Sequence, residues 1–166
     1  YALEGYLSPN TYEIYTSATP EEIIKKLLSQ TEAVFRDEWH DRADALGMTM
    51  DQVITLASLI EKEAKQADFA RVSAVFHNRL KINMALGSDV TIKYVTGTER
   101  MSLNNSDLSV DSPYNTYRNK GLPPGPICNP SAAAIEAALY PDETFKLPLF
   151  LLQGSCDGRT VLLPHA

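Results

Sequence analysis

Apolar side chains recur at three- and four-residue intervals in the first half of the chain, which is the pattern of amphipathic helices. The first such stretch opens on Thr19, Pro20 and Glu22: a capping residue, a proline at the first position and an acid that completes a capping box. Its apolar positions are Ile23, Ile24, Leu27, Leu28, Val34 and Phe35. We therefore expect one helix from Pro20 to about Leu46, with Gly47 as its stop.

The same spacing predicts two further helices. Thr49 and Gln52 form a second capping box, and the stretch behind it has apolar positions at Val53, Leu56, Ala57, Ile60 and Ala64. A third helix is expected at Phe69–Leu80, with apolar positions at Val72, Val75, Phe76 and Leu80. Later in the chain, Ser131 precedes a short alanine-rich helix that ends near Tyr140.

Outside these helices the hydrophobic periodicity is weaker. Residues 1–16 are rich in tyrosine and are expected to form an ordered extended segment, whereas residues 96–130 carry prolines and glycines and are expected to form a long loop. Two short apolar runs, Leu149–Leu152 and Thr160–Leu163, flank a turn-like Gly-Ser-Cys-Asp-Gly sequence and are strand candidates. The predicted class is α+β, a mainly helical domain with a small C-terminal β-sheet and a long Pro/Gly-rich loop.

The composition indicates one globular domain spanning residues 1–166, with 44% hydrophobic and 22% charged residues. Its net charge of −6 argues against a partner with a phosphate backbone, so nucleic-acid binding is not expected. No apolar run approaches the roughly 20 residues of a membrane span. The redox state of Cys128 and Cys156 does not follow from the sequence.

Neither a metal site nor a cofactor is expected. Metal-binding spacings such as Cys-x-x-Cys and His-Glu-x-x-His are absent from the sequence. His40 stands close to Asp41 and Asp44, but such a group is more often the solvated face of a helix than a set of ligands.

The composition of the long loop suits a sugar. It contains Ser112–Tyr117 and then Gly121–Pro126, so rigid prolines stand near Tyr, Asn and Thr side chains. These side chains combine apolar faces with hydrogen-bonding groups, and a sugar likewise combines hydroxyls with apolar C–H faces. Loops of this length are often functional. A rigid loop that merely covers the core explains the residue types equally well.

Two glutamates in the second predicted helix are candidates for acid–base chemistry. Residues two apart do not share a helix face, so Glu61 and Glu63 flank the apolar stripe on opposite sides. Glu61 has Lys65 four residues later, which favours an exposed ion pair. Glu63 leans over Leu59 and Ile60, and an apolar surround raises the pKa of a carboxyl, as a general acid near neutral pH requires. Glu63 is the better candidate, although charged residues border the stripe of any amphipathic helix.

Several blocks of the chain resemble the MltG/YceG-like endolytic murein transglycosylases. The blocks are Leu3–Leu7, Pro9–Tyr12, Ala57–Glu63, Val75–Leu80, Ser88–Thr91, Ser112–Tyr117, Gly121–Ile127 and Asn129-Pro130. They stand in the family's order and cover nearly the whole chain. The resemblance is to the family's catalytic domain, so the N-terminal membrane anchor and the LysM-like module of full-length members are expected to be absent.

The resemblance implies an enzyme that cuts the β-1,4 bond between MurNAc and GlcNAc within nascent glycan strands and leaves 1,6-anhydro-MurNAc ends. The family's catalytic glutamate corresponds to Glu63, the loop would be an active-site loop, and Glu61 is the secondary candidate. The residues expected to hold the glycan are Asn78, Asp89, Tyr114, Asn115, Thr116 and Tyr117. Each of these six could equally make a structural hydrogen bond, and Asp89 could be an N-cap for the segment after it.

The resemblance also implies a location and partners. The expected place is the extracytoplasmic face of the cell membrane, reached only through the missing anchor, and the expected partners are peptidoglycan glycan strands and the peptidoglycan synthases (penicillin-binding proteins). Two other functions stay open. Gly87, where the family commonly has Gln, favours a non-catalytic glycan-binding module. An aminodeoxychorismate lyase would need pyridoxal phosphate on a lysine, but Lys62 and Lys65 lie on the exposed side of their helix.

Overall fold

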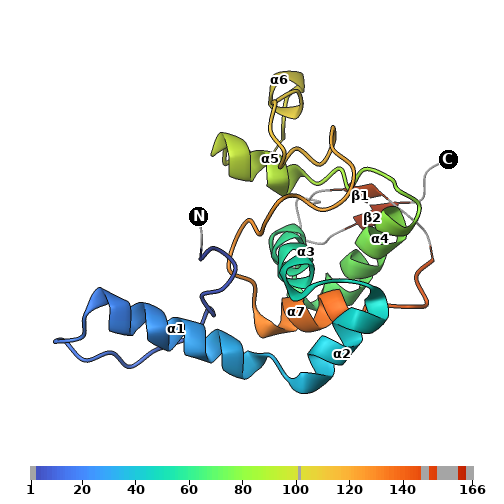
Figure 1. Ribbon diagram of the computed structural model, residues 1–166. Coiled ribbons are helices and arrows are strands. Elements are labelled where there is room, and N and C mark those ends of the chain that lie inside the picture. Colours follow the sequence, from blue (N-terminus) through green and yellow to red (C-terminus); the bar gives the residue numbers. More distant parts are fainter. Residues whose placement is uncertain (1–2, 101, 147–149, 153–160, 164–166) are drawn as a thin grey trace.

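The computed structural model describes residues 3–100 and 102–146, together with the backbone of residues 150–152 and 161–163 (Figure 1). Within these residues the helices, in chain order, are α1 (Pro20–Val34), α2 (Asp37–Leu46), α3 (Met50–Glu63), the 3-10 turn η1 (Gln66–Asp68), α4 (Phe69–Lys81), α5 (Asp89–Thr96), α6 (Asn105–Leu108) and α7 (Ala132–Leu139). Two strands, β1 (Phe150–Leu152) and β2 (Val161–Leu163), pair antiparallel with Leu151 opposite Leu162. None of the described helices is long and apolar enough to cross a membrane.

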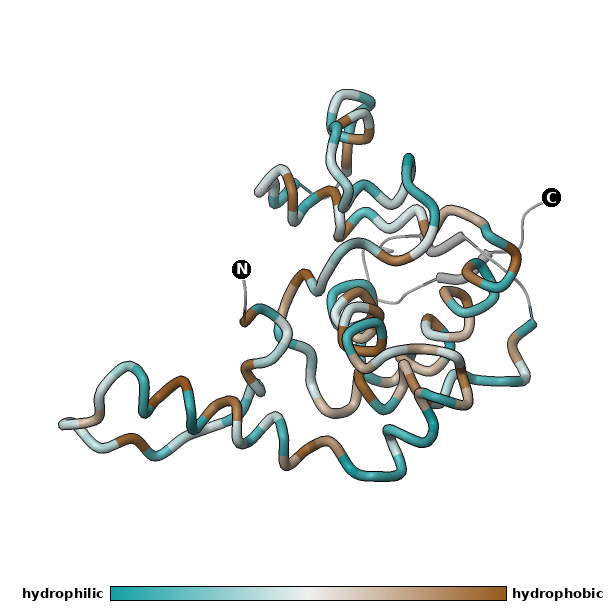
Figure 2. The backbone as a smooth tube through the Cα atoms, viewed as in Figure 1, coloured by the Kyte–Doolittle hydropathy of each residue, from teal (hydrophilic) through white to brown (hydrophobic). Residues whose placement is uncertain are grey.

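Helix α3 is the centre of the core (Figure 1). Every residue from Val53 to Ile60 is buried. A helix that is buried on all sides must be covered on all sides, and α3 is packed against α2, α4, α5 and α7. Figure 2 shows hydrophobic segments where α3, α4 and α7 meet. The C-terminal end of α3 is therefore held rigidly by several neighbours.

The helix starts predicted from the sequence are confirmed. Both expected capping boxes form: the Thr19 side chain accepts from the N–H of Glu22, and the Thr49 side chain accepts from the N–H of Gln52. Ser131 caps α7 in the same way. Gly47 ends α2 with a left-handed φ of 68°, a conformation that glycine adopts without steric cost.

The single helix predicted from Pro20 to about Leu46 is wrong, because the chain forms two helices there. Helix α1 ends at Val34, and Phe35 and Arg36 take extended conformations before α2 begins. Phe35 packs against the core and meets the buried Trp39 edge to face, with ring centroids 6.1 Å apart. We attribute the break to this packing, because the sequence contains neither Gly nor Pro at that point.

The predicted α+β class is also wrong, because the described fold is helical. The core is built mainly from helices, and α7 packs against both α3 and α4. Strands β1 and β2 have three residues each, and among the described residues they form only a two-stranded ladder with each other, not a layer of the fold. The long loop follows α5 and contains the single-turn helix α6. Cys156 lies outside the described residues.

The tyrosine-rich N-terminal segment is docked onto the end of the long loop. The side-chain oxygen Oδ1 of Asn129 accepts hydrogen bonds from the backbone N–H groups of Gly5 and Leu7, at 2.7 and 3.2 Å. Gly5 has a φ of 90°, and a Cβ atom added to it would lie 2.4 Å from Cγ of Pro126. Only glycine fits this contact. The segment thus clamps the loop next to α3.

Candidate active site

Glu63 stands at the point where α3 ends. It is the last residue of the helix, and the chain continues in an extended conformation at Ala64. The residue is partly exposed, while the preceding turns of α3 are buried. Its oxygen Oε2 accepts a hydrogen bond of 2.8 Å from the hydroxyl of Ser88, the residue that precedes α5. A carboxyl on a rigid helix is thereby held between the core and an opening to solvent.

The electrostatic surroundings of Glu63 favour a neutral carboxyl. The pKa of Glu63 is raised from its usual 4.5 to about 7, chiefly by burial and in smaller part by the neighbouring Asp89 carboxylate. The hydrogen bond from Ser88 and the charges of Arg79 and Lys93 act in the opposite direction, but desolvation is the largest effect. A carboxyl in this state can hold a proton near neutral pH and release it to a substrate.

Arg79 lies behind this carboxyl and is fully buried on α4. Its Nη1 group donates to the backbone carbonyl of Leu86. Burial lowers the pKa of Arg79, whereas the nearby Glu63 and Tyr117 favour its charged form. The guanidinium can stabilise Glu63 when that carboxyl is ionised.

Asp89 and Tyr117 form the outer side of the site. The Tyr117 hydroxyl donates to the Asp89 carboxylate, and burial together with this bond raises the pKa of Tyr117. Tyr117 is 40% exposed, so it can contact a ligand. A Cβ atom added to Gly87 would lie 3.6 Å from Nη1 of Arg79 and 3.7 Å from Cε1 of Tyr117. A Cβ atom at this position would therefore be in van der Waals contact with both side chains.

The other loop residues predicted to hold a glycan face into the protein. Asn115 and Thr116 are buried; Asn115 donates to the carbonyls of Leu108 and Val110 and accepts from the N–H of Tyr117. Thr116 accepts from the backbone N–H of Ser88. The Tyr114 ring packs against Tyr94, with centroids 5.1 Å apart. These three residues shape the loop that carries Tyr117, a role that the sequence left as the alternative for each.

Asn78 lies apart from Glu63, on the wall of a separate cavity of about 950 Å³. Its amide donates to the backbone carbonyl of Phe145. The neighbouring cavity residues Arg42 and His77 likewise hold the carbonyls of Leu139 and Ala138. These polar side chains fasten the C-terminal end of α7 and the segment after it to α2 and α4. Glu63 does not line the cavity.

Glu61 has a structural partner on the opposite flank of α3. Its Oε2 atom accepts from both the backbone N–H and the hydroxyl of Ser131, at 3.0 and 2.6 Å. The ion pair with Lys65 that the spacing favoured is replaced by this contact. Ser131 is the N-cap of α7, so Glu61 ties the start of α7 to the end of α3.

Sequence reasoning missed Ser88 and Arg79. The signal for Arg79 was its position three and four residues after Phe76 and Val75, on the apolar face of α4. A basic residue in such a place needs a buried acceptor or a carboxylate. No grouping of three or more potential metal ligands occurs in the part of the chain that the structure describes.

The chain is similar to known proteins over most of its length. The sequence profile of the YceG-like family matches residues 1–161. An endolytic murein transglycosylase of Bacillus subtilis is 42% identical over 144 residues, which is 86% of this chain and 40% of the relative. An endolytic murein transglycosylase of Streptococcus pneumoniae is 39% identical over 165 residues, which is 96% of this chain and 29% of the relative.

A solved structure shares the fold. The crystal structure of a yceG-like protein from Listeria monocytogenes superposes with a TM-score of 0.85 at 37% identity, covering 97% of this chain and 52% of that protein. The chain thus spans less than half the length of the two curated relatives and about half of the solved one.

Proposed function

The chain belongs to the YceG-like family, and from this premise we propose that it is the catalytic unit of an endolytic peptidoglycan lytic transglycosylase. The proposed reaction cuts the MurNAc-β-1,4-GlcNAc bond of nascent glycan strands and leaves 1,6-anhydro-MurNAc ends. The observation that carries the proposal is the state of Glu63, whose pKa of about 7 suits a general acid. The names of the two curated relatives support the same reaction.

One carboxyl is sufficient for this chemistry. Glu63 donates its proton to the glycosidic oxygen as the bond from C1 to that oxygen breaks and oxocarbenium character develops on MurNAc. The resulting carboxylate then takes the proton of the C6 hydroxyl while the C6 oxygen forms a bond to C1. Glu63 is protonated again at the end, and no water is consumed. The nucleophile belongs to the substrate, so no second carboxylate is needed to activate it.

The neighbours of Glu63 have separate roles in this proposal. Arg79 is placed to stabilise the carboxylate formed after the first proton transfer. Asp89 and Tyr117 are the candidates for holding the glycan, because they are the partly exposed members of the site. The Asp89 carboxylate also lies close enough to Glu63 to stabilise positive charge that develops on the substrate nearby.

The decisive test compares Glu63→Gln with Glu61→Gln on uncrosslinked glycan strands, with mass spectrometry of the products. Wild type and Glu61→Gln are expected to make internal cuts with 1,6-anhydro-MurNAc ends. Glu63→Gln is expected to lose activity by about 10² to 10⁴-fold, because removal of a general acid–base has this effect. Circular dichroism of all three proteins controls for folding.

Other products would point to other functions. Reducing MurNAc ends would mean hydrolysis and would contradict the transglycosylase reaction. Binding of strands without any cutting would favour the glycan-binding module, for which the absence of a side chain at Gly87 is the supporting observation. Activity that survives in Glu63→Gln and disappears in Glu61→Gln would move the acid to Glu61.

We further infer a place and partners for the whole protein from the family. A strand-cutting enzyme works where strands are made, at the extracytoplasmic face of the membrane and close to peptidoglycan synthases. Crosslinking of the full-length protein in cells, followed by detection of penicillin-binding proteins, tests this inference. Recovery of the protein without any synthase would count against it.

A further inference from the structure

Ser88 occupies the N-cap position of α5 without capping the helix. At the starts of α1, α3, α6 and α7, by contrast, a Thr, Asn or Ser side chain accepts a hydrogen bond from a backbone N–H of the first turn. Such a cap stabilises a helix by about 1 kcal/mol. Ser88 instead turns its hydroxyl to Oε2 of Glu63. The N-caps of α2 and α4, Arg36 and Asp68, also make no side-chain cap, but the hydroxyl of Ser88 has a carboxyl as its partner instead.

Two buried threonine side chains hold Ser88 in this orientation. The backbone N–H of Ser88 donates to the hydroxyl of Thr116 at 3.0 Å, and the hydroxyl of Thr91 donates to the carbonyl of Ser88 at 2.8 Å. The hydroxyls of Thr91 and Thr116 lie 2.9 Å apart, within hydrogen-bond distance. All three residues are at most 1% exposed. The backbone of Ser88 is therefore fixed on both sides, and its hydroxyl has Glu63 as its partner.

We propose that Ser88 is a positioning residue that engages Oε2 of Glu63, so that Oε1 is the oxygen that carries the proton and delivers it to the glycosidic oxygen. This inference rests on the proposed function. A carboxyl held by one oxygen cannot rotate freely, and its second oxygen keeps one direction. After the proton has left, the Ser88 hydroxyl donates to a charged acceptor, which strengthens the bond when the carboxylate needs it.

The titration of Glu63 also depends on the groups that face it from the packed elements. These are Arg79 on α4, Asp89 and Lys93 on α5, and Tyr117 on the long loop. None of them is altered by a substitution at Ser88. A change at Ser88 therefore isolates the contribution of its hydroxyl.

The test is the variant Ser88→Ala, with Ser73→Ala as the matched control. Ser73 is a buried serine of α4, and its hydroxyl has no hydrogen-bond partner among the described residues. Loss of the Ser88 hydroxyl removes a bond to the ionised carboxyl, so the pKa of Glu63 is expected to rise by about one unit. Turnover is expected to fall about tenfold. The remaining activity should persist to higher pH than in wild type, because Glu63 stays protonated up to a higher pH.

Two measurements separate this inference from the proposed function. Carbon-13 NMR of glutamate-labelled protein, with the Glu63 signal identified by its loss in Glu63→Gln, gives the pKa of Glu63 without any substrate. The pH profile of strand cutting gives the catalytic consequence. If wild type does not cut glycan, the proposed function fails, while the NMR titration still decides whether Ser88 controls the carboxyl.

Further variants decide the result even if Ser88→Ala does not fold. Ser88→Cys keeps the size of the side chain with a weaker donor, and it is expected to raise the pKa of Glu63 in the same direction by less. Ser88→Thr restores the hydroxyl and is expected to restore the wild-type titration. An unchanged pKa of Glu63 in a folded Ser88→Ala or Ser88→Cys protein would overturn the proposal. An equal shift in Ser73→Ala would do the same.

Discussion

At the scale of single residues, two glutamates of one helix have been given different surroundings. Glu61 accepts two hydrogen bonds from Ser131 and fastens one helix to another. Glu63 accepts one from Ser88 and is otherwise desolvated, with a pKa of about 7. The two side chains are chemically identical but lie in different surroundings, because residues two apart on a helix point to opposite flanks.

We predict that Glu63→Gln stabilises the fold increasingly as pH rises. The pKa of Glu63 is about 7 in the folded chain and about 4.5 when unfolded, so the folded state binds the proton more tightly. Its favourable contribution is complete below pH 4.5 and is lost as pH rises through 7. Glutamine carries no charge, so the variant does not lose this contribution at high pH. The free energy of unfolding of Glu63→Gln minus that of wild type should therefore be up to about 3 kcal/mol larger at pH 8 than at pH 4.

Urea unfolding at pH 4, 6 and 8 measures this difference. Glu61→Gln serves as the control, since it weakens a carboxylate contact with Ser131 and should gain no stability at high pH. A difference between Glu63→Gln and wild type that stays constant with pH would mean that Glu63 ionises normally.

At the scale of elements, short contacts join segments that are distant in the sequence. Glu61 connects α3 to α7, and the carboxylate of Glu4 accepts a 2.6 Å hydrogen bond from the hydroxyl of Tyr94 on α5. Gly5 lies against Pro126 and Ile54. These contacts hold the N-terminal segment, the long loop and α5 around the end of α3.

We predict that Gly5→Ala destabilises the protein far more than Gly97→Ala. Both glycines have positive φ, 90° and 65°, so both substitutions carry the backbone cost of about 1 kcal/mol. A Cβ atom on Gly97 meets nothing within 4 Å, whereas one on Gly5 would overlap Pro126. The overlap should add about 2 kcal/mol. Thermal unfolding should therefore show a decrease in Tm of about 10 °C for Gly5→Ala and about 3 °C for Gly97→Ala. Equal decreases would mean that the N-terminal segment is not docked at Pro126.

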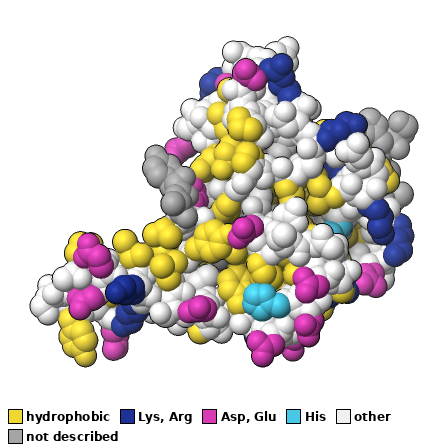
Figure 3. All heavy atoms as spheres, in the orientation of Figure 1, with side chains coloured by type: hydrophobic (Ala, Val, Ile, Leu, Met, Phe, Trp, Pro, Cys, Tyr) yellow, Lys and Arg dark blue, Asp and Glu magenta, His cyan; other side chains and the backbone are white. Residues whose placement is uncertain are grey.

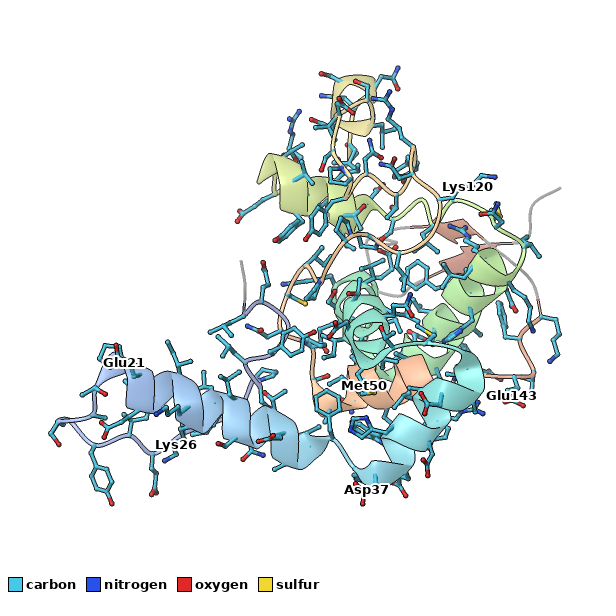
Figure 4. All side chains as sticks on the ribbon, viewed as in Figure 1. Glu21, Lys26, Asp37, Met50, Lys120 and Glu143 are labelled. Carbon is cyan, nitrogen blue, oxygen red and sulfur yellow. The ribbon has the colours of Figure 1, made fainter. Side chains whose placement is uncertain are left out.

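At the scale of the whole molecule, the helices differ greatly in how well they are covered. α3 is surrounded by other helices, while α1 extends away from them (Figure 1). Glu21 and Lys26 mark α1 at a distance from the other labelled side chains (Figure 4). Figure 3 shows apolar side chains along α1, and Ile14, Tyr15 and Ile24 are 44%, 86% and 38% exposed.

We predict that α1 exchanges its amide hydrogens at least about a hundredfold faster than α3. Thr31 is the one buried residue of α1, whereas α3 buries eight. Local opening of α1 therefore exposes little apolar surface, while opening of α3 requires the core to unfold. Hydrogen exchange with mass spectrometry, performed at two protein concentrations, measures the difference. If α1 and α3 were equally protected from exchange at both protein concentrations, the prediction would be contradicted. Protection of α1 that increases with protein concentration would show self-association.

The local elements whose signals lie within a few residues could be predicted from the sequence. The capping boxes at Thr19 and Thr49, the glycine stop at Gly47 and the helical periodicity of α3 and α4 all depend on neighbours along the chain. The choice of Glu63 over Glu61 also relied on residues nearby in the sequence, because the apolar turn behind Glu63 is part of the same helix. The resemblance to the YceG-like family likewise depends only on short sequence blocks and their order along the chain.

Where the chain bends, and which polar groups meet, depends on contacts between segments that are distant in the sequence. The break at Phe35 depends on Trp39 and the core, and the packing of α2, α4, α5 and α7 around α3 makes the described fold helical and not α+β. The meeting of Ser88 with Glu63, and of Glu61 with Ser131, joins residues 25 and 70 positions apart. Such contacts depend on how whole helices pack, and packing is set by many weak interactions that no short stretch of sequence contains.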